Sequence, residues 1–128
     1  LLTQLHRAYT DRMARPAKAE KPELLDRVME YVETHLSDKI TIADVAHVFY
    51  VSESTIIHTF RKKMGVSFYR CVTQRRLIAA KTLIGEGMQL ETVGQHVGFS
   101  DYSTFYRAFK QEFGISPRRY RELQGGER

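Results

Sequence analysis

The sequence predicts an all-α fold of two helix-turn-helix subdomains joined by a linker helix, with about seven helices. Three observations predict it. Apolar residues recur at helical spacing, and no stretch alternates as a strand does. One segment occurs twice at an offset of 49 positions, with the matched pairs Phe60/Phe109, Gly65/Gly114 and Ser67/Ser116. Each copy completes a short helix, a tight turn and a second helix, which is the helix-turn-helix pattern.

The composition describes a basic, soluble chain. It has 128 residues, 42% of them hydrophobic, and a formal net charge of +5. A positive balance favours a polyanionic partner. The single cysteine, Cys71, excludes an internal disulfide and suits a reducing cytoplasm. No run is long enough to span a membrane. The chain opens on Leu, so we expect a fragment whose upstream domain is missing.

The first part of the chain divides into a tail and a subdomain. Residues 1–21 are expected to be the end of an N-terminal helix and a linker, and residues 22–66 the first helix-turn-helix subdomain. Pro22 suits a helix start. Thr41, with Asp44 three residues later, predicts the cap of a short second helix. Ser52 predicts the cap of a third helix, which Gly65 ends.

The remainder divides in the same way. Residues 67–86 are expected to form the linker helix, residues 87–123 the second subdomain and residues 124–128 a disordered tail. Ser67 opens the linker helix, which is about 18 residues long. A short helix follows near 91–96, and Ser100 is predicted to cap the next helix, which Gly114 closes. Ser116 before Pro117 marks the start of the last helix.

Helical periodicity separates a buried from an exposed face on the second helix of each unit. Ile56 and Phe60 share one face, as do Phe105 and Phe109, and these are predicted core residues. The opposite faces carry polar or cationic side chains with the reach for base edges and phosphates. These side chains are Ser54, His58 and Arg61 in the first unit, and Ser103, Arg107 and Lys110 in the second, with Ile57 and Tyr106 on the shoulders.

The middle of the chain is strongly basic. From Ser54 to Gly85 there is no acidic residue, whereas seven are basic: Arg61, Lys62, Lys63, Arg70, Arg75, Arg76 and Lys81. Either a solvated helix face or a one-sided phosphate-binding surface would produce this distribution, and the acidic segment before it favours the second. Arg76 lies among apolar neighbours, so a buried ion pair, with Asp44 as a candidate partner, competes with a phosphate contact.

A linker helix of about 18 residues is about 27 Å long, and successive major grooves lie roughly 34 Å apart. One chain could therefore place two recognition helices about one DNA turn apart. Because the two outward faces differ, the expected site is asymmetric.

From about Leu24 to Arg121 the chain resembles the DNA-binding domain of the AraC/XylS family of bacterial transcription regulators. The matches are Ala46, Ser52, Phe60-Arg-Lys, Gly65, Arg76-Leu77, Ala80, Leu83-Ile84, Gly98-Phe99-Ser100-Asp101, Phe105, Arg107, Phe109-Lys110, Gly114, Ser116-Pro117 and Tyr120-Arg121. Three residues depart from the family pattern: Cys71 replaces Tyr, Gly94 replaces Ala, and Ile57 is apolar where a polar reader is frequent. The glycine predicts a less rigid second unit.

The resemblance implies double-stranded promoter DNA as the partner, RNA polymerase as a second partner of an activator, and a small-molecule effector sensed only through a missing N-terminal domain. Base contacts are then expected at Ser54, Ile57, His58, Tyr102, Ser103, Tyr106 and Arg107. Phosphate contacts are expected at Ser52, Arg61, Lys62, Thr104 and Lys110. A packing role for Tyr102 competes with its contact.

The alternatives are a protein-interaction module and a DNA-targeting appendage of a larger DNA-modifying enzyme. No catalytic constellation is recognisable in the sequence, so an enzyme is not expected. No cofactor is implied. Five histidines without ligand spacing and one cysteine make a metal site unexpected.

Overall fold

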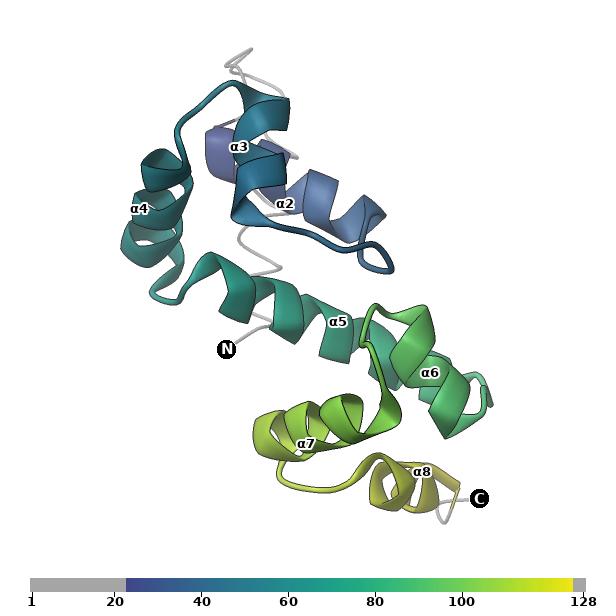
Figure 1. The fold of residues 1–128 in the computed structure, drawn as a ribbon. Coiled ribbons are helices and arrows are strands. Elements are labelled where there is room, and N and C mark those ends of the chain that lie inside the picture. The colour runs from purple at the N-terminus through teal and green to yellow at the C-terminus, as the bar shows by residue number, and fades with distance from the viewer. Residues whose placement is uncertain (1–22, 126–128) are drawn as a thin grey trace, which may run out of the picture.

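The computed structural model describes residues 23–125, all of whose regular elements are α-helices. They are α2 (Leu24–Thr34), α3 (Ile42–Phe49), α4 (Glu53–Met64), α5 (Phe68–Gly85), α6 (Leu90–His96), α7 (Tyr102–Phe113) and α8 (Pro117–Gly125) (Figure 1). The predicted all-α fold with a central linker helix is confirmed. The expected N-terminal tail and linker, residues 1–21, and the helix start at Pro22 lie outside the described residues.

Capping side chains fix where most of these helices begin. The Oγ1 of Thr41 accepts a hydrogen bond from the backbone N–H of Asp44, and the Oγ of Ser67 accepts one from Arg70. Ser116 does the same for Arg119 at the start of α8, with Pro117 in the first helical position. Each bond satisfies an amide that has no partner within its own helix. These three starts agree with the sequence prediction.

Glycines in the left-handed region end both second helices. Gly65 follows α4 with φ 75° and Gly114 follows α7 with φ 79°. Residues with a Cβ adopt this conformation at a cost, so glycine is favoured here. Both helices therefore end at the equivalent point of each copy, as the repeat predicts.

Two predicted boundaries are wrong. The cap of α7 is Asp101 and not Ser100, because the Asp101 carboxylate accepts the Thr104 N–H at 2.7 Å. A carboxylate at a helix start also interacts favourably with the helix dipole. At the other end, α8 continues through Gln124 and Gly125, where the sequence predicts a disordered tail. The rest of that tail, residues 126–128, lies outside the described residues.

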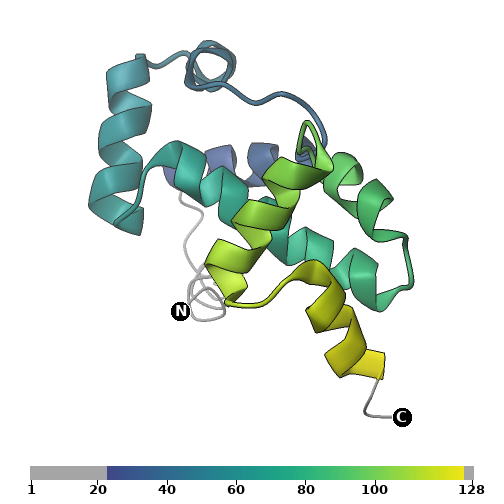
Figure 2. The same cartoon turned by 60° about the horizontal axis from the view of Figure 1, so that its bottom comes forward.

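The side chains form two hydrophobic cores, and α5 contributes to both. The first core combines α2, α3 and α4 with Phe68, Cys71 and Val72 of α5. The second combines α6, α7 and α8 with Leu77, Ala80 and Ile84 of α5. We call these groups the first unit (α2–α4) and the second unit (α6–α8). Both views place α4 beside the N-terminal end of α5 and the second unit around its C-terminal half (Figures 1 and 2).

The predicted core residues of the repeat are confirmed. Ile56, Phe105 and Phe109 are completely buried, and Phe60 is 1% exposed. Phe105 and Phe109 pack edge to face, with ring centroids 5.7 Å apart. Cys71 is buried in the first core, where it packs as a small apolar group.

Gly94 is the small residue that lets the two helices of the second unit cross closely, as its place in the helix-turn-helix pattern predicts. A Cβ at this position would lie 2.9 Å from the Cβ and Cγ of Phe105. Helix α6 therefore approaches α7 more closely than an alanine would permit. The departure from the family pattern at this position accompanies a tight helix crossing.

Candidate nucleic-acid interface

Helix α4 presents a polar face to solvent on the side opposite Ile56 and Phe60. Ser54 and His58 are exposed, and Ile57 is 47% exposed. Arg61 and Lys62 extend this face toward the end of the helix and are exposed as well. All the α4 side chains predicted to contact DNA therefore reach solvent on one helix.

Helix α7 presents the second exposed face. Ser103, Arg107 and Lys110 are exposed, whereas Tyr102 and Tyr106 are half-buried. The Lys110 ammonium lies 6.0 Å from the centroid of the Tyr106 ring, which is within the range of a cation–π contact. The outward positions predicted from helical periodicity are thus exposed in both units.

Tyr102 lies partly in the second core. Its ring packs at 5.9 Å from Phe105 and 6.2 Å from Tyr106, measured between ring centroids. Burial, and to a smaller extent the Glu91 carboxylate, raises the pKa of the Tyr102 hydroxyl, so it remains a neutral hydrogen-bonding group. Tyr102 therefore has the packing role that the sequence left open. The part of its side chain that remains exposed is accessible to a ligand.

The two helices begin with different capping groups. Ser52 caps α4 with a neutral hydroxyl, which accepts the Thr55 N–H at 3.1 Å and also pairs with the Thr55 hydroxyl. Asp101 caps α7 with a carboxylate, whose pKa is lowered by hydrogen bonds from Thr104 and by the Arg107 guanidinium. A negative group beside a first turn disfavours a phosphate there, and α4 has one as well, because Glu53 lies in its first turn.

Most of the basic side chains between Ser54 and Gly85 bind partners within the protein. This corrects the prediction that they form a one-sided phosphate-binding surface. Five of the seven cationic side chains have internal partners. The contacts are Lys63–Glu23 at 3.0 Å, Arg70–Glu112 at 2.6 Å, Arg75–Glu33 at 3.4 Å, Arg76 with two backbone carbonyls, and Lys81 over the Phe113 and Tyr120 rings. Within residues 23–125, Arg61 and Lys62 are the two of the seven without such a contact. The basic side chains of this stretch therefore contact mainly acidic and aromatic side chains elsewhere in the chain.

The predicted Arg76–Asp44 ion pair is wrong. Arg76 Nε donates to the Leu36 carbonyl at 3.0 Å, and Nη2 donates to the Asp38 carbonyl at 2.8 Å. Burial lowers the pKa of Arg76. Backbone oxygens of the loop after α2 take the place of the expected carboxylate.

One cation near this surface was missed from the sequence. Arg118, in the first turn of α8, is exposed and acts electrostatically on the Tyr102 hydroxyl, so it lies beside the start of α7. A basic residue in a first helical turn opposes the helix dipole.

Two further observations concern other kinds of site. Among residues 23–125, no three His, Cys, Asp or Glu side chains form a group that could hold a metal ion. None of the helices described above combines the length and apolar character needed to cross a membrane.

Sequence comparison identifies the relatives of this chain. A family model described as a helix-turn-helix domain matches residues 26–123. The "Probable transcriptional regulator LumQ" of Photobacterium leiognathi is 38% identical over 104 residues, which are 79% of this chain and 42% of that protein. The arabinose operon regulatory protein of Escherichia coli is 37% identical over 105 residues, or 78% of this chain and 36% of that protein. The chain thus spans less than half the length of these relatives.

Solved structures share the fold. The C-terminal domain of AraT, a response regulator from Geobacillus stearothermophilus, superposes with a TM-score of 0.75 at 26% identity, covering 83% of this chain and 88% of that domain. The DNA-binding domain of AdpA, solved in complex with a target DNA, has a TM-score of 0.78 at 22% identity, covering 84% and 97%. The names of these relatives describe regulators. The chain belongs to the AraC family of helix-turn-helix transcription regulators, and the residues described here form the DNA-binding domain of such a bacterial protein.

Proposed function

We propose that this domain binds double-stranded promoter DNA sequence-specifically, with α4 and α7 docked in adjacent major grooves. One observation carries the proposal. The two helices bury equivalent aromatic positions, Phe60 and Phe109, but expose different side chains, such as His58 and Arg107. Conserved packing beneath unlike polar faces is what two separate readings of base sequence require.

We assign base contacts to the exposed and half-exposed side chains of each helix. On α4 they are Ser54, Ile57 and His58, and on α7 they are Tyr102, Ser103, Tyr106 and Arg107. Arginine can donate two hydrogen bonds to a guanine, serine can bond to several bases, and an apolar side chain such as Ile57 can contact a thymine methyl group.

We assign phosphate contacts to the edges of the same faces, at Ser52, Arg61, Lys62, Thr104 and Lys110. The three cations are exposed and bind no carboxylate among residues 23–125, so they can exchange bound counterions for phosphates. Ser52 and Thr104 lie in the first turns, where amides face outward. For α7 the Asp101 carboxylate opposes such a contact, so the cations contribute most there.

The proposed site is asymmetric and spans about two major-groove segments. Helix α5 has 18 residues, which at about 1.5 Å each gives about 27 Å. The side chains and recognition helices extend this reach toward the roughly 34 Å between successive grooves. A single chain can then cover a site that a symmetric dimer usually covers.

We propose that the remainder of such a regulator supplies its other activities. A small-molecule effector would act through another domain, because the relatives are more than twice as long as the part matched here. If the protein is an activator, RNA polymerase is a second partner. Since the target is chromosomal, the protein acts in the cytoplasm.

Selection of bound sequences from random DNA tests the proposal. We expect the purified chain to enrich one asymmetric motif and, as a monomer, to protect about 20 base pairs in a footprint. Protection of a single half-site would show that only one unit reads DNA. Failure to enrich any motif would refute sequence-specific binding.

Two substitutions on α7 separate base reading from phosphate binding. Arg107→Ala should weaken binding to the selected site by about 1–3 kcal/mol and relax the preference at one base pair, and Arg107→Lys should restore charge without that preference. Lys110→Ala should weaken binding to all sequences similarly and reduce the slope of log K against log salt by about 1. If Arg107→Ala weakens binding to every sequence equally, Arg107 contacts phosphate instead.

A further inference from the structure

Helix α5 passes from one core to the other within a few residues. Val72 belongs to the first core and Leu77 to the second. Each unit packs on α5 through its own core. Side chains that connect one unit to the other add a further constraint on the placement of α4 relative to α7.

Arg76 lies at this crossing point, next to Leu77. Its Nε and Nη2 donate to the Leu36 and Asp38 carbonyls, both of which lie in the loop between α2 and α3. A guanidinium holds its donors in one rigid plane, so two bonds fix both the distance and the direction of the loop. The half of α5 that carries the second core is thereby attached to the first unit.

The second unit reaches the same point through Gly98. This residue lies in the turn between α6 and α7 with φ 107°. A Cβ there would overlap the Leu36 carbonyl oxygen and lie 2.7 Å from Arg76 Nε. The loop after α2, the linker helix and the turn before α7 therefore meet around one guanidinium.

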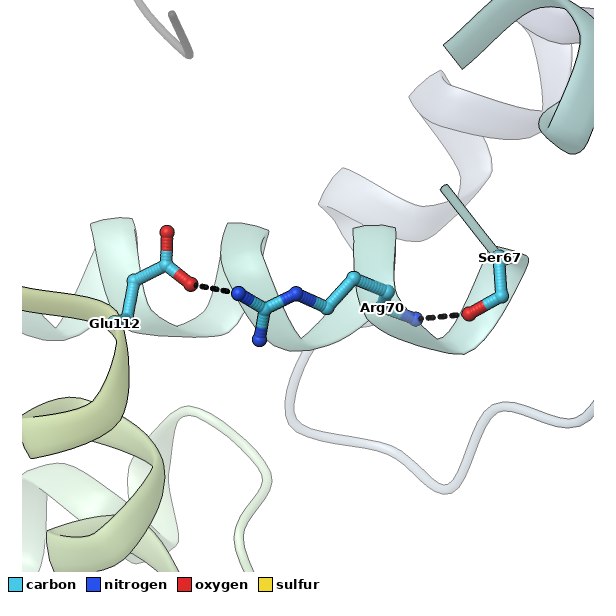
Figure 3. Close-up of polar contacts among 3 residues, drawn as sticks. All are labelled: Ser67, Arg70 and Glu112. Carbon is cyan, nitrogen blue, oxygen red and sulfur yellow. Dashed lines mark hydrogen bonds and ion pairs between the residues drawn. The ribbon is translucent and has the colours of Figure 1, made fainter. Parts of the chain in front are cut away.

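A second connection joins the opposite ends. Arg70, in the first turn of α5, donates through Nη2 to Glu112 Oε1 at 2.6 Å near the end of α7 (Figure 3). The Glu112 side chain is 12% exposed and the Arg70 side chain 41% exposed, so the pair is shielded from solvent on the Glu112 side only. Ser67 accepts the Arg70 N–H and fixes the helix turn from which Arg70 extends. The α5 end that packs in the first core is thus tied to a helix of the second unit.

We propose that Arg76 is a positioning residue which, with Gly98 and the Arg70–Glu112 pair, holds α4 and α7 at one separation and rotation and so sets the number of base pairs between the two half-sites. This inference rests on the proposed function. Two of the three Arg76 nitrogens donate to the loop carbonyls, so its proposed role is to position the units and not to contact DNA. A structural role alone would change the amount of folded protein but not the preferred spacing.

The test uses the site obtained by selection, with base pairs inserted or deleted between its halves. Each inserted base pair rotates one half-site by about 35° and moves it by about 3.4 Å. Affinity is measured for every spacing with the wild-type chain and with Arg76→Ala, Arg76→Lys and Glu112→Gln. Lys63→Ala is the matched control, since it also removes one positive charge but breaks only a pair with Glu23 inside the first unit.

The readout is the ratio of affinities at the best and the displaced spacing, which does not depend on the fraction of folded protein. For the wild type we expect one inserted base pair to weaken binding about tenfold or more, the scale of a lost base contact. Arg76→Ala should bring the ratio close to one, and Arg76→Lys should give an intermediate ratio because one ammonium lacks the planar fork. Glu112→Gln should lower the ratio independently, and Lys63→Ala should leave it unchanged.

Three outcomes would contradict either the positioning role of Arg76 or the proposed function. If Arg76→Ala and Glu112→Gln weaken binding equally at every spacing, these residues only stabilise the fold and the inference is overturned. If the wild-type ratio is already close to one, the units read independently, which overturns the inference while leaving two-groove binding intact. A wild-type footprint over a single half-site would instead overturn the proposed function.

Discussion

Replacing Gly94 by alanine tests whether the tight crossing of α6 and α7 matters. Alanine is the better helix former by about 1 kcal/mol, so propensity alone predicts a more stable protein. The added Cβ, however, would lie 2.9 Å from the Cβ and Cγ of Phe105. The Phe105 Cβ is fixed by the backbone, and the Cγ can move only by turning the ring within a completely buried site.

The packing cost should exceed the propensity gain. Overpacking of a well-filled core typically costs about 1–3 kcal/mol, which leaves a net loss of about 1 kcal/mol after the gain from helix propensity is subtracted. For a domain of this size that corresponds to a Tm about 4–8 °C lower. The two explanations of Gly94, a tolerated departure or a packing requirement, therefore predict shifts of opposite sign.

Thermal and urea unfolding followed by circular dichroism measure the effect. Gly85→Ala is the matched control, because Gly85 is helical and its added Cβ would meet only Gln124 Oε1, at an ordinary 3.5 Å. That variant should gain roughly 0.5 kcal/mol. If Gly94→Ala raises the Tm as Gly85→Ala does, the close approach to Phe105 is not energetically significant and the reasoning is refuted.

Two further predictions concern titratable groups. Asp101→Ala should lower the Tm by roughly 5 °C through loss of the cap on Thr104, whereas Ser100→Ala should have little effect; the reverse ranking would restore Ser100 as the cap. Because the pKa of Asp101 is lowered in the folded state, its contribution is present above the unfolded pKa and is lost as pH falls through the folded pKa, so the Asp101→Ala difference should shrink in acid unfolding series. Burial raises the pKa of the Cys71 thiol against a smaller opposing effect of Arg75, so a thiol reagent at neutral pH should label native protein far more slowly than urea-unfolded protein; equal rates would contradict its burial.

Local signals predicted the helices because each is short-range in origin. Thr41, Ser67 and Ser116 are caps whose hydrogen bonds span three residues, and Gly65 and Gly114 end helices through their own backbone conformation. Such features are decided within one helical turn. The error at Ser100 arose because Asp101 can cap equally well, and the local sequence contains no information on which of the two adopts the required backbone angles.

The exposed faces of α4 and α7 also followed from periodicity. Once Phe60 and Phe109 are placed inside, the rotation of about 100° per residue leaves His58 and Arg107 outside. Their exposure is confirmed, and their contacts with bases remain predictions. Tyr102 was ambiguous from the sequence since its position lies between the two faces, and the structure places it half in each environment.

The basic stretch shows where sequence reasoning ends. The charges between Ser54 and Gly85 can be counted from the sequence. The sequence does not show that Arg70 binds Glu112 or that Arg76 donates to the Leu36 carbonyl. Those partners are about 40 residues away along the chain and become neighbours only after both cores have formed. Helix identity, helix ends and outward faces are therefore properties of local sequence. The partner of each charged side chain and the placement of the two units relative to each other arise from long-range packing around α5, because only folding brings the distant partners within bonding distance.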